Sequence, residues 1–387
     1  MIFLDYNATA PLLPQARQAM QAALDQDLGN PSSLHRAGQR ARALIEAARR
    51  QVADGLRTRP GQVVLTSGAT ESNTLIWRGI LGPQLRLGLR PRALLAPLDH
   101  PSVLTLAAQL ESDGVELVWL ALSRDGRLDL DSLAAALATA SPSLVHVSAV
   151  AGELGTLADM PQIVHLVRKT AAHLHVDAAQ AWGRVEVDSE RWPVDSLALS
   201  GHKVGGPMGI GALWLRAGVR PRAQAPGHQE HGLRAGTENL IGAAGLAAAV
   251  AEIPTRLGQV QPVRALRDNL AARLETVENA VRLGPRDPLA EVGNTLCLAF
   301  ASVPAPLLVM ALDLAGVAAS AGSACSSGTA EPSRLLRDLV AQCGLAPARA
   351  SEAVRFSLGP GLREDDVAAA AQIVRQCVAR IRGTRAS

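Results

Sequence analysis

The chain has 387 residues, 48% of them hydrophobic, and a formal net charge of +3 at pH 7. A chain of this length exceeds what one small core can organise, and it predicts a large domain accompanied by a smaller one. Its basic residues are scattered, and Trp, Phe and Tyr make up only 2% of the sequence, so the composition argues against a direct nucleic-acid partner.

Two uncharged stretches, residues 132–152 and 292–312, are long enough to raise the question of a membrane span. Both contain proline and hydroxyl side chains, so they predict buried α/β core and no membrane association. The first seven residues lack the basic-then-apolar order of a signal peptide. The four cysteines form no Cys-x-x-Cys motif, and together these features predict a reducing, cytoplasmic location.

In chain order, the first predicted elements are two helices, at residues 13–26 and 34–56, separated by Gly-Asn-Pro-Ser-Ser at residues 29–33. Gly, Pro and Ser in that segment favour a turn followed by a helix N-cap. From about residue 60, short apolar runs alternate with helix-length segments. The runs predict seven strands, at residues 62–66, 93–96, 115–120, 144–150, 174–177, 196–200 and 211–215. Strands separated mostly by helices indicate a largely parallel sheet covered on both faces.

After residue 237 the pattern changes to α+β. The predicted elements there are helices at residues 240–252, 262–277 and 363–381 and strands at residues 295–300 and 353–358. We therefore assign residues 1–255 to a large domain and residues 256–387 to a small α+β domain. Residues 1–30 are expected to contribute to the small domain.

Lysine is rare in this chain, because only Lys169 and Lys203 stand among its 38 lysine and arginine residues. A buried lysine amine can lose its proton and act as a nucleophile, whereas arginine stays charged. Lys169 ends an amphipathic helical pattern, residues 161–170, where a solvated cation is expected. Lys203 follows the predicted strand 196–200 and precedes a Gly-rich turn, which places it where α/β sites form. The alternative for Lys203 is a surface lysine in a loop.

Two further motifs also follow predicted strands. Residues 67–72, Ser-Gly-Ala-Thr-Glu-Ser, lie between an apolar run and a helix, an arrangement that suits a phosphate but also occurs without any ligand. Asp177 ends the predicted strand 174–177. A strand-end aspartate and a strand-end lysine are what a pyridoxal 5′-phosphate (PLP) site needs, with the carboxylate on the pyridine nitrogen and the amine on the aldehyde carbon. Taken alone, a buried aspartate is often just a cap or an ion pair.

Eight segments together resemble, in order and spacing, the class V aminotransferase-like PLP enzymes, and specifically the cysteine desulfurases. The segments are residues 4–9, 29–35, 66–71, 175–180, 200–203, 234–237, 322–327 and 354–359. The match runs nearly the whole chain, and the last two segments are those that separate desulfurases from other members of the fold. The resemblance implies a PLP-dependent transferase fold of the aspartate aminotransferase type, with a seven-stranded sheet in a large PLP-binding domain.

The resemblance also implies how the cofactor is held. Lys203 would bind PLP covalently, Asp177 would pair with its pyridine nitrogen, and Gln180 would reach its phenolic oxygen. His100 would stack on the ring and relay protons. Expected ligands of the cofactor phosphate are Ala69, Thr70, Ser200, His202 and Thr237. Thr237 is expected to reach into the neighbouring subunit's site of a homodimer.

On the substrate side, the resemblance implies that Arg355 binds the substrate carboxylate through a bidentate guanidinium, with Asn30 as a second contact. Cys325 would accept the sulfur. It lies in a run of small residues, 321–330, which leaves a thiol mobile and exposed. This loop resembles that of the long-loop group, which passes persulfide sulfur to protein partners. No metal site is expected, although Cys325 is also a candidate transient ligand of a nascent iron–sulfur cluster.

Two segments depart from the family pattern. Family members usually carry Asn-Asn-Glu where this chain has Ala-Gly-Glu at residues 151–153, so Gly152 replaces an amide expected near the phenolic oxygen and the substrate. A hydrogen bond to a charged group is worth roughly 1.5–3 kcal/mol, so its loss would weaken catalysis or alter substrate choice without abolishing the chemistry. Residues 226–231, Pro-Gly-His-Gln-Glu-His, stand where a Gly-rich run and an arginine are expected. That change is expected to affect the loop near the phosphate and the dimer contact.

These features predict a cysteine desulfurase that converts L-cysteine to L-alanine and forms a persulfide on Cys325. The sulfur would pass to an iron–sulfur scaffold or a thiolation carrier. Two alternatives stay open: another PLP lyase, such as selenocysteine lyase, permitted by Gly152, and a catalytically weakened PLP-fold protein that binds partners. Retention of the whole catalytic set argues against the second, because a binding protein has no need of it.

Overall fold

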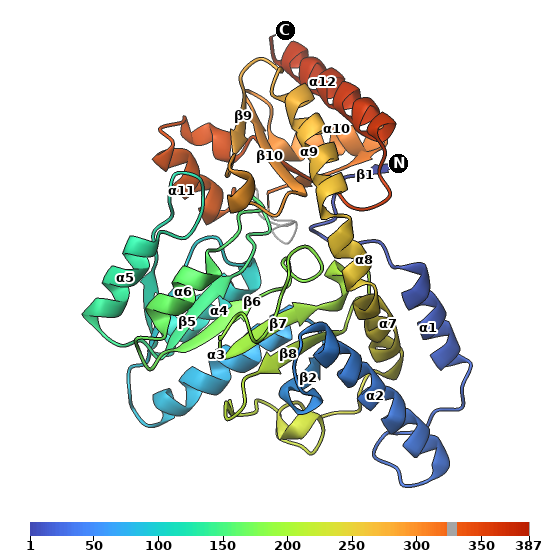
Figure 1. The fold of residues 1–387 in the computed structure, drawn as a ribbon. Coiled ribbons are helices and arrows are strands. Elements are labelled where there is room, and N and C mark those ends of the chain that lie inside the picture. The colour runs from blue at the N-terminus through green and yellow to red at the C-terminus, as the bar shows by residue number, and fades with distance from the viewer. Residues whose placement is uncertain (323–330, 387) are drawn as a thin grey trace.

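The central element of the fold is a seven-stranded sheet (Figure 1). The computed structural model describes residues 1–322 and 331–386. In spatial order the strands are β2 (Val63–Thr66), β8 (Gly211–Leu215), β7 (Ser196–Ser200), β6 (His173–Asp177), β5 (Leu144–Ser148), β3 (Arg92–Leu95) and β4 (Glu116–Trp119). β8 runs antiparallel to both of its neighbours, and the other neighbouring pairs are parallel. The predicted, largely parallel sheet is confirmed, and each predicted strand is present within two residues of its expected bounds.

Successive residues of the central strands pack on opposite faces of the sheet, which is why these strands are apolar throughout. Leu94 of β3 belongs to the core on one face, and its neighbours Ala93 and Leu95 belong to the core on the other. The helices on the face of Ala93 are α3 (Ala69–Arg86) and α4 (Pro101–Ser112). Those on the face of Leu94 are α2 (Arg36–Gly55), α5 (Leu130–Thr139), α6 (Met160–Val167) and α7 (Leu240–Ala251). Helix α1 (Pro14–Leu24) packs against α7.

A second, antiparallel sheet lies at the other end of the molecule (Figure 1). Its order is β12 (Ser320–Ala321), β13 (Ala353–Ser357), β10 (Thr295–Phe300) and β9 (Ala280–Leu283). The helices that share its core are α9 (Val260–Leu274), α10 (Ala305–Leu314) and α12 (Glu364–Ala386). Leu4 belongs to this same core, and β1 (Ile2–Phe3) pairs in parallel with β11 (Val317–Ala318). The first residues of the chain therefore pack with the last third.

The remaining helices lie where the two parts of the chain meet. They are α8 (Ile253–Gly258), which connects α7 to α9, and α11 (Arg334–Gln342). Cys297 of β10 belongs to the core of the large sheet together with residues of α11, so the two sheets are joined by continuous packing. The expected boundary between residues 255 and 256 falls inside α8, and the division into domains stays a prediction.

The structure corrects some local expectations. Lys169 does not lie in a helix, because α6 ends at Val167 and Lys169 follows in a turn. The strands β9, β11 and β12 were not expected, because β11 and β12 have only two residues each and Arg282 interrupts the apolar run of β9. No helix in the described parts of the chain combines the length and apolarity needed to cross a bilayer.

Candidate active site

Lys203 lies directly after β7, in a short 3₁₀ turn, Gly201–Lys203, that follows the last strand residue, Ser200. The turn carries the lysine side chain out at the carboxyl end of the strand. Its Nζ donates hydrogen bonds to the carbonyl oxygens of Ala8, at 2.8 Å, and of Asn7. The amine is thus held between the large sheet and the N-terminal segment.

Asp177 lies at the end of the neighbouring strand, β6, where it pairs in register with Ala198 of β7. Its carboxylate is buried, and its two oxygens accept hydrogen bonds from Asn73 Nδ2, at 2.8 Å, and from the backbone N–H of Ala179, at 2.9 Å. Asn73 Oδ1 contacts His175 Nε2 at 2.8 Å, and burial keeps the pKa of His175 well below 6.5. The neutral imidazole therefore donates to Asn73, and this bond turns the amide so that it donates to Asp177.

Donor groups gather at the start of α3, beside the end of β7. The helix begins at Ala69 and Thr70 after Gly68, whose φ of 152° is one that a side chain rarely allows. The first N–H groups of a helix have no intrahelical acceptor, which suits them to an anion. A Cβ at Gly68 would lie 3.8 Å from the hydroxyl of Ser200, so the helix start and the strand end are close neighbours.

His202 adds a neutral ring to this group of donors. Its Nδ1 contacts the hydroxyl of Thr9 at 3.2 Å. Burial, reinforced by the positive charge of Lys203, lowers the pKa of His202 to about 4. The ring is therefore uncharged near neutral pH, and a neutral imidazole carries one N–H donor.

His100 is the N-cap of α4, and its Nδ1 accepts a hydrogen bond from the backbone N–H of Ser102 at 3.2 Å. The same Nδ1 lies 2.7 Å from the Ser102 hydroxyl, which lies 3.4 Å from the hydroxyl of Thr70. These contacts fix the ring orientation and join the starts of α3 and α4. The role of His100 in stacking on the cofactor ring and relaying protons stays a prediction.

Arg355 approaches from the small sheet, where it lies on β13 and is 3% exposed. Its guanidinium donates to the carbonyl oxygen of Gly152, at 3.1 Å, and to Asp5 Oδ1, at 2.8 Å. The same Gly152 oxygen accepts a hydrogen bond from Asn7 Nδ2 at 3.0 Å, and the carbonyl of Asn7 accepts from Lys203. Arg355 and Lys203 are therefore joined through one short chain of hydrogen bonds, although they come from different sheets.

Gln180 lies in the loop after β6, on the same hydrogen-bond chain. Its Nε2 donates to the carbonyl oxygen of Asn7 at 2.9 Å, and its Oε1 accepts from Arg184. An ideal Cβ at Gly152 would meet Gln180 Nε2 at 3.3 Å. The side chain that is missing at position 152 would thus point toward Gln180.

Glu153 follows Gly152 and is almost completely buried. Its Oε2 accepts a hydrogen bond from the Ser333 hydroxyl at 2.7 Å, and Ser333 also caps α11 through the N–H of Leu336. This contact ties the loop that carries Gly152 to the helix that follows residues 323–330.

Three predicted site residues do not join this network in the described structure. Thr237 is exposed, in the loop between Leu233 and α7. Asn30 is exposed in the loop before α2, and its Oδ1 accepts from the backbone N–H of Ser32 at 2.9 Å. Cys325 lies outside the described residues, as does the loop on which the long-loop assignment depends. The roles of all three stay predictions.

The unusual segment 226–231 contains a buried ion pair. Glu230 accepts two hydrogen bonds from Arg49, at 2.6 and 3.0 Å, and one from the backbone N–H of Leu65, at 2.7 Å. A second pair, Arg234 to Glu71 at 3.2 Å, ties the following segment to α3. The two ion pairs thus fix Glu230 of this segment and Arg234 just after it. Nothing in the structure explains why His228 and His231 stand in the segment.

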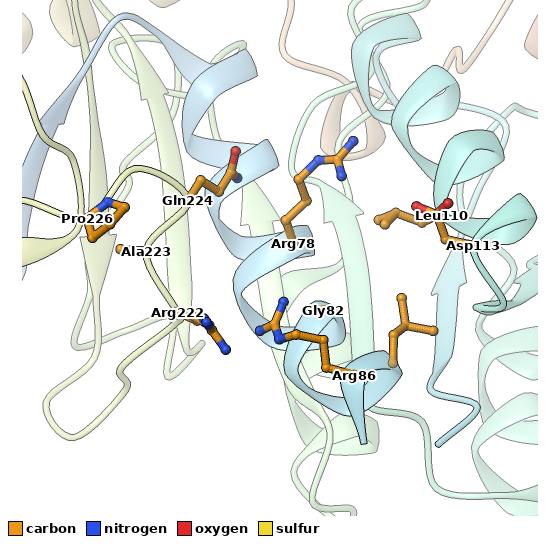
Figure 2. Close-up of a pocket in the computed structure, with 10 residues that line it drawn as sticks. Arg78, Gly82, Arg86, Leu110, Asp113, Arg222, Ala223, Gln224 and Pro226 are labelled. Carbon is orange, nitrogen blue, oxygen red and sulfur yellow. The ribbon is translucent and has the colours of Figure 1, made fainter. Parts of the chain in front are cut away.

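A cavity of about 870 Å³ lies along α3, away from these residues (Figure 2). Figure 2 shows the Arg86 and Arg222 side chains pointing toward each other beside Gly82, with Arg78 and Asp113 farther along the groove. None of the predicted site residues lines it. The described residues also contain no cluster of three or more His, Cys, Asp or Glu side chains arranged to hold a metal ion.

The sequence alone did not indicate a functional role for several residues of this hydrogen-bond network. Asn7 and Asp5 stand inside the motif at residues 4–9, so that motif was the available signal. Asn73 and Ser333 carry no local signal, because their contacts with Asp177 and Glu153 span 104 and 180 residues of chain.

The residues at the ends of β6 and β7 fit PLP. The site offers a carboxylate for a pyridine N–H, a primary amine for an aldehyde, and N–H and hydroxyl donors for a phosphate. A family model described as aminotransferase class-V matches residues 2–369. The chain belongs to the aminotransferase class-V family.

Named relatives within this class-V family are cysteine desulfurases. One from Cereibacter sphaeroides is 39% identical over 364 residues, which cover 92% of this chain and 90% of that protein. Cysteine desulfurase IscS of Tolumonas auensis is 36% identical over 392 residues, covering 98% and 93%. The solved structure of a NifS-like protein matches with a TM-score of 0.88 at 26% identity, covering 98% of this chain and 99% of that one. These findings confirm the predicted family and fold, and this class-V enzyme is PLP-dependent.

Proposed function

We propose that this protein is a cysteine desulfurase that converts L-cysteine to L-alanine and transfers the sulfur to Cys325. The observation that carries the proposal is the convergence of three groups from two sheets. The Lys203 amine is linked to the Arg355 guanidinium through Asn7 and Gly152, and the Asp177 carboxylate ends the strand beside the one that Lys203 follows. A guanidinium opposite a cofactor-binding amine suits an α-amino acid, because the guanidinium binds its carboxylate.

Each residue then has a defined task. PLP, when bound, supplies an electron sink for the electron pair released at the substrate Cα. Arg355 binds the substrate carboxylate and orients Cα toward Lys203. The Lys203 amine takes the Cα proton, and His100 Nε2 or Lys203 returns a proton as alanine forms. With the cofactor bound, Asp177 would pair with its pyridine nitrogen, and the start of α3 with Ser200 would hold its phosphate.

Sulfur transfer requires a thiolate outside the substrate. The Cys325 thiolate attacks the substrate sulfur, so that an S–S bond forms as the C–S bond of cysteine breaks. The electron pair of the C–S bond stays on carbon, which is protonated to give alanine, and Cys325 is left as a persulfide. The reaction therefore needs no external oxidant or reductant.

The described cysteines support the assignment of this role to Cys325. Cys297 pairs in register with Arg355, but burial, reinforced by the charge of Glu153, raises the pKa of its thiol to about 12. Cys377 is buried in α12, and Cys343 is exposed at the end of α11 with its Sγ on the carbonyl of Arg124. A buried neutral thiol is a poor nucleophile, and a thiol outside the site cannot reach the substrate.

We further propose that the protein acts as a homodimer in the cytoplasm and passes persulfide sulfur to an acceptor protein of iron–sulfur assembly or thiolation. The exposure of Thr237 supports the homodimer. Thr237 does not join the site of its own chain, so its hydroxyl is available to bind the cofactor phosphate in the site of the partner subunit. The described cysteines are free thiols, which supports a reducing compartment.

Gly152 favours a second candidate, a related lyase such as selenocysteine lyase, because an amide expected beside the substrate is missing. The experiment is to compare alanine formation from L-cysteine, L-selenocysteine and L-cysteine sulfinate at equal enzyme concentration. A desulfurase shows the highest kcat/KM with cysteine, and Cys325→Ala removes that activity. A preference for selenocysteine that survives Cys325→Ala would assign the lyase instead.

A further inference from the structure

A second, smaller cavity lies between Tyr6 of the N-terminal segment, the end of α8 and the start of α9. Its volume is about 30 Å³, and Tyr6, Asn294, Gly359 and two arginines, Arg184 and Arg256, are among the residues that line it. This volume is large enough for one or two water-sized particles. It is too small for a phosphorylated or organic ligand.

The two arginines of this cavity have no counter-charge. Arg184 is 8% exposed and donates only to neutral acceptors, namely the carbonyl oxygens of Tyr6 and Gln180 and the amide of Gln180. Neither Arg184 nor Arg256 forms an ion pair with any carboxylate of the described residues. Residues 323–330 contain no acidic side chain that might supply one. Uncompensated charge of this kind is costly inside a protein.

Arg256 also has an unsatisfied donor. Its Nε is buried without a hydrogen-bond partner in the described structure. The guanidinium lies against two glycines, since a Cβ at Gly183 or at Gly205 would come within 3.4 Å of it. Burial and the positive charges of Arg256 and Arg355 lower the pKa of Arg184 to about 9, which reflects the same lack of an anion.

We propose that this cavity binds one small monovalent anion, chloride in solution, between Arg184 and Arg256. An anion accepts the orphan Nε–H of Arg256 and neutralises part of the positive charge, which water cannot do. The tyrosine hydroxyl in the wall is already used, because Tyr6 donates to the carbonyl oxygen of Pro360 at 3.0 Å. The two guanidiniums are therefore the groups that select the charge of the ligand.

The site adjoins the catalytic network through Arg184. This guanidinium bonds Gln180, whose Nε2 donates to the same Asn7 carbonyl that accepts from Lys203. A bound anion holds Arg184 in its charged form beside Gln180. The anion thus supports the junction between the two sheets without touching substrate, and this inference stands whether or not the proposed activity is correct.

The test is thermal unfolding of the full-length, PLP-loaded protein as sodium chloride replaces sodium gluconate at constant ionic strength. Specific binding raises Tm with chloride and then saturates, because a ligand of the native state stabilises it by mass action. Arg256→Gln should lose this chloride dependence. Arg50→Gln, at an exposed arginine of α2, should keep it. A Tm that is unchanged by the exchange, or that changes equally in Arg256→Gln, would overturn the proposal.

A second measurement does not depend on any variant. Crystals of the wild-type holoenzyme soaked in sodium bromide should show an anomalous peak within hydrogen-bond reach of both guanidiniums. A water molecule without anomalous signal in the cavity, or bromide bound only elsewhere, would show that no anion site exists here.

Discussion

Burial of Glu153 makes its protonation part of the stability of the active site. The residue is 8% exposed, and burial raises its pKa above 4.5, against the opposing effects of the Ser333 hydrogen bond and the charges of Arg355 and His100. The native state therefore retains a proton that the unfolded chain has already released. Stability is complete below the unfolded pKa and falls as the pH rises toward the native pKa, because the native state binds more protons in that window.

The magnitude is bounded by one proton, which changes the free energy of unfolding by at most about 1.4 kcal/mol per pH unit. Glu153→Gln removes this titration and keeps an oxygen that accepts the Ser333 hydroxyl bond. Ser333→Ala removes both that bond and the cap on α11, and each contributes about 1 kcal/mol. Glu153→Gln should change how the free energy of unfolding depends on pH. Ser333→Ala should lower the free energy of unfolding by about 2 kcal/mol at low pH, where Glu153 is protonated.

Urea unfolding of PLP-saturated protein from about pH 5 to about pH 8 measures both effects. The stability of the wild type should fall relative to that of Glu153→Gln as the pH rises. Glu190→Gln, at an exposed glutamate, controls for the loss of a charge and should follow the wild type. Parallel pH profiles for the wild type and Glu153→Gln would refute the reasoning.

Three further changes test separate parts of the structure. Asp177→Asn removes the anionic partner of the pyridine nitrogen and should lower kcat/KM for cysteine roughly 10- to 100-fold; an unchanged value would contradict that role. Gly152→Asn should fold, because the nearest group to its Cβ is the flexible end of Gln180, and should raise kcat/KM about tenfold by restoring an amide. Glu230→Gln leaves the buried Arg49 with only the half-exposed carboxylate of Glu46 and should cost about 3 kcal/mol in urea unfolding, a loss that a surface pair would not show.

The large sheet was predictable because its strands are buried on both faces and appear in the sequence as continuous apolar runs. Lys203 and Asp177 were predictable for a related reason, since a polar residue at the end of such a run lies at the edge of the sheet. The small sheet was predicted only in part, because β12 has two residues and the apolar run of β9 is interrupted by Arg282. Its two longer strands, β10 and β13, were found.

Contacts between residues far apart in the chain could not be predicted from the sequence. The Gly152 carbonyl accepts from Asn7 and from Arg355, which lie 145 and 203 residues away along the chain. No periodicity or spacing in the sequence predicts these hydrogen bonds, because they depend on how the two sheets pack. The same holds for Arg184 and Arg256, whose lack of counter-charge is visible only once every carboxylate near them has been placed.

The products formed from L-cysteine by Cys325→Ala, compared with the wild type, test the proposed activity most directly. With a thiol reductant present, the wild type should release equal amounts of alanine and sulfide. Cys325→Ala should keep the visible absorption of bound cofactor and release no sulfide, whereas Cys343→Ala, at an exposed cysteine, should behave like the wild type. Wild-type turnover by Cys325→Ala would contradict the account.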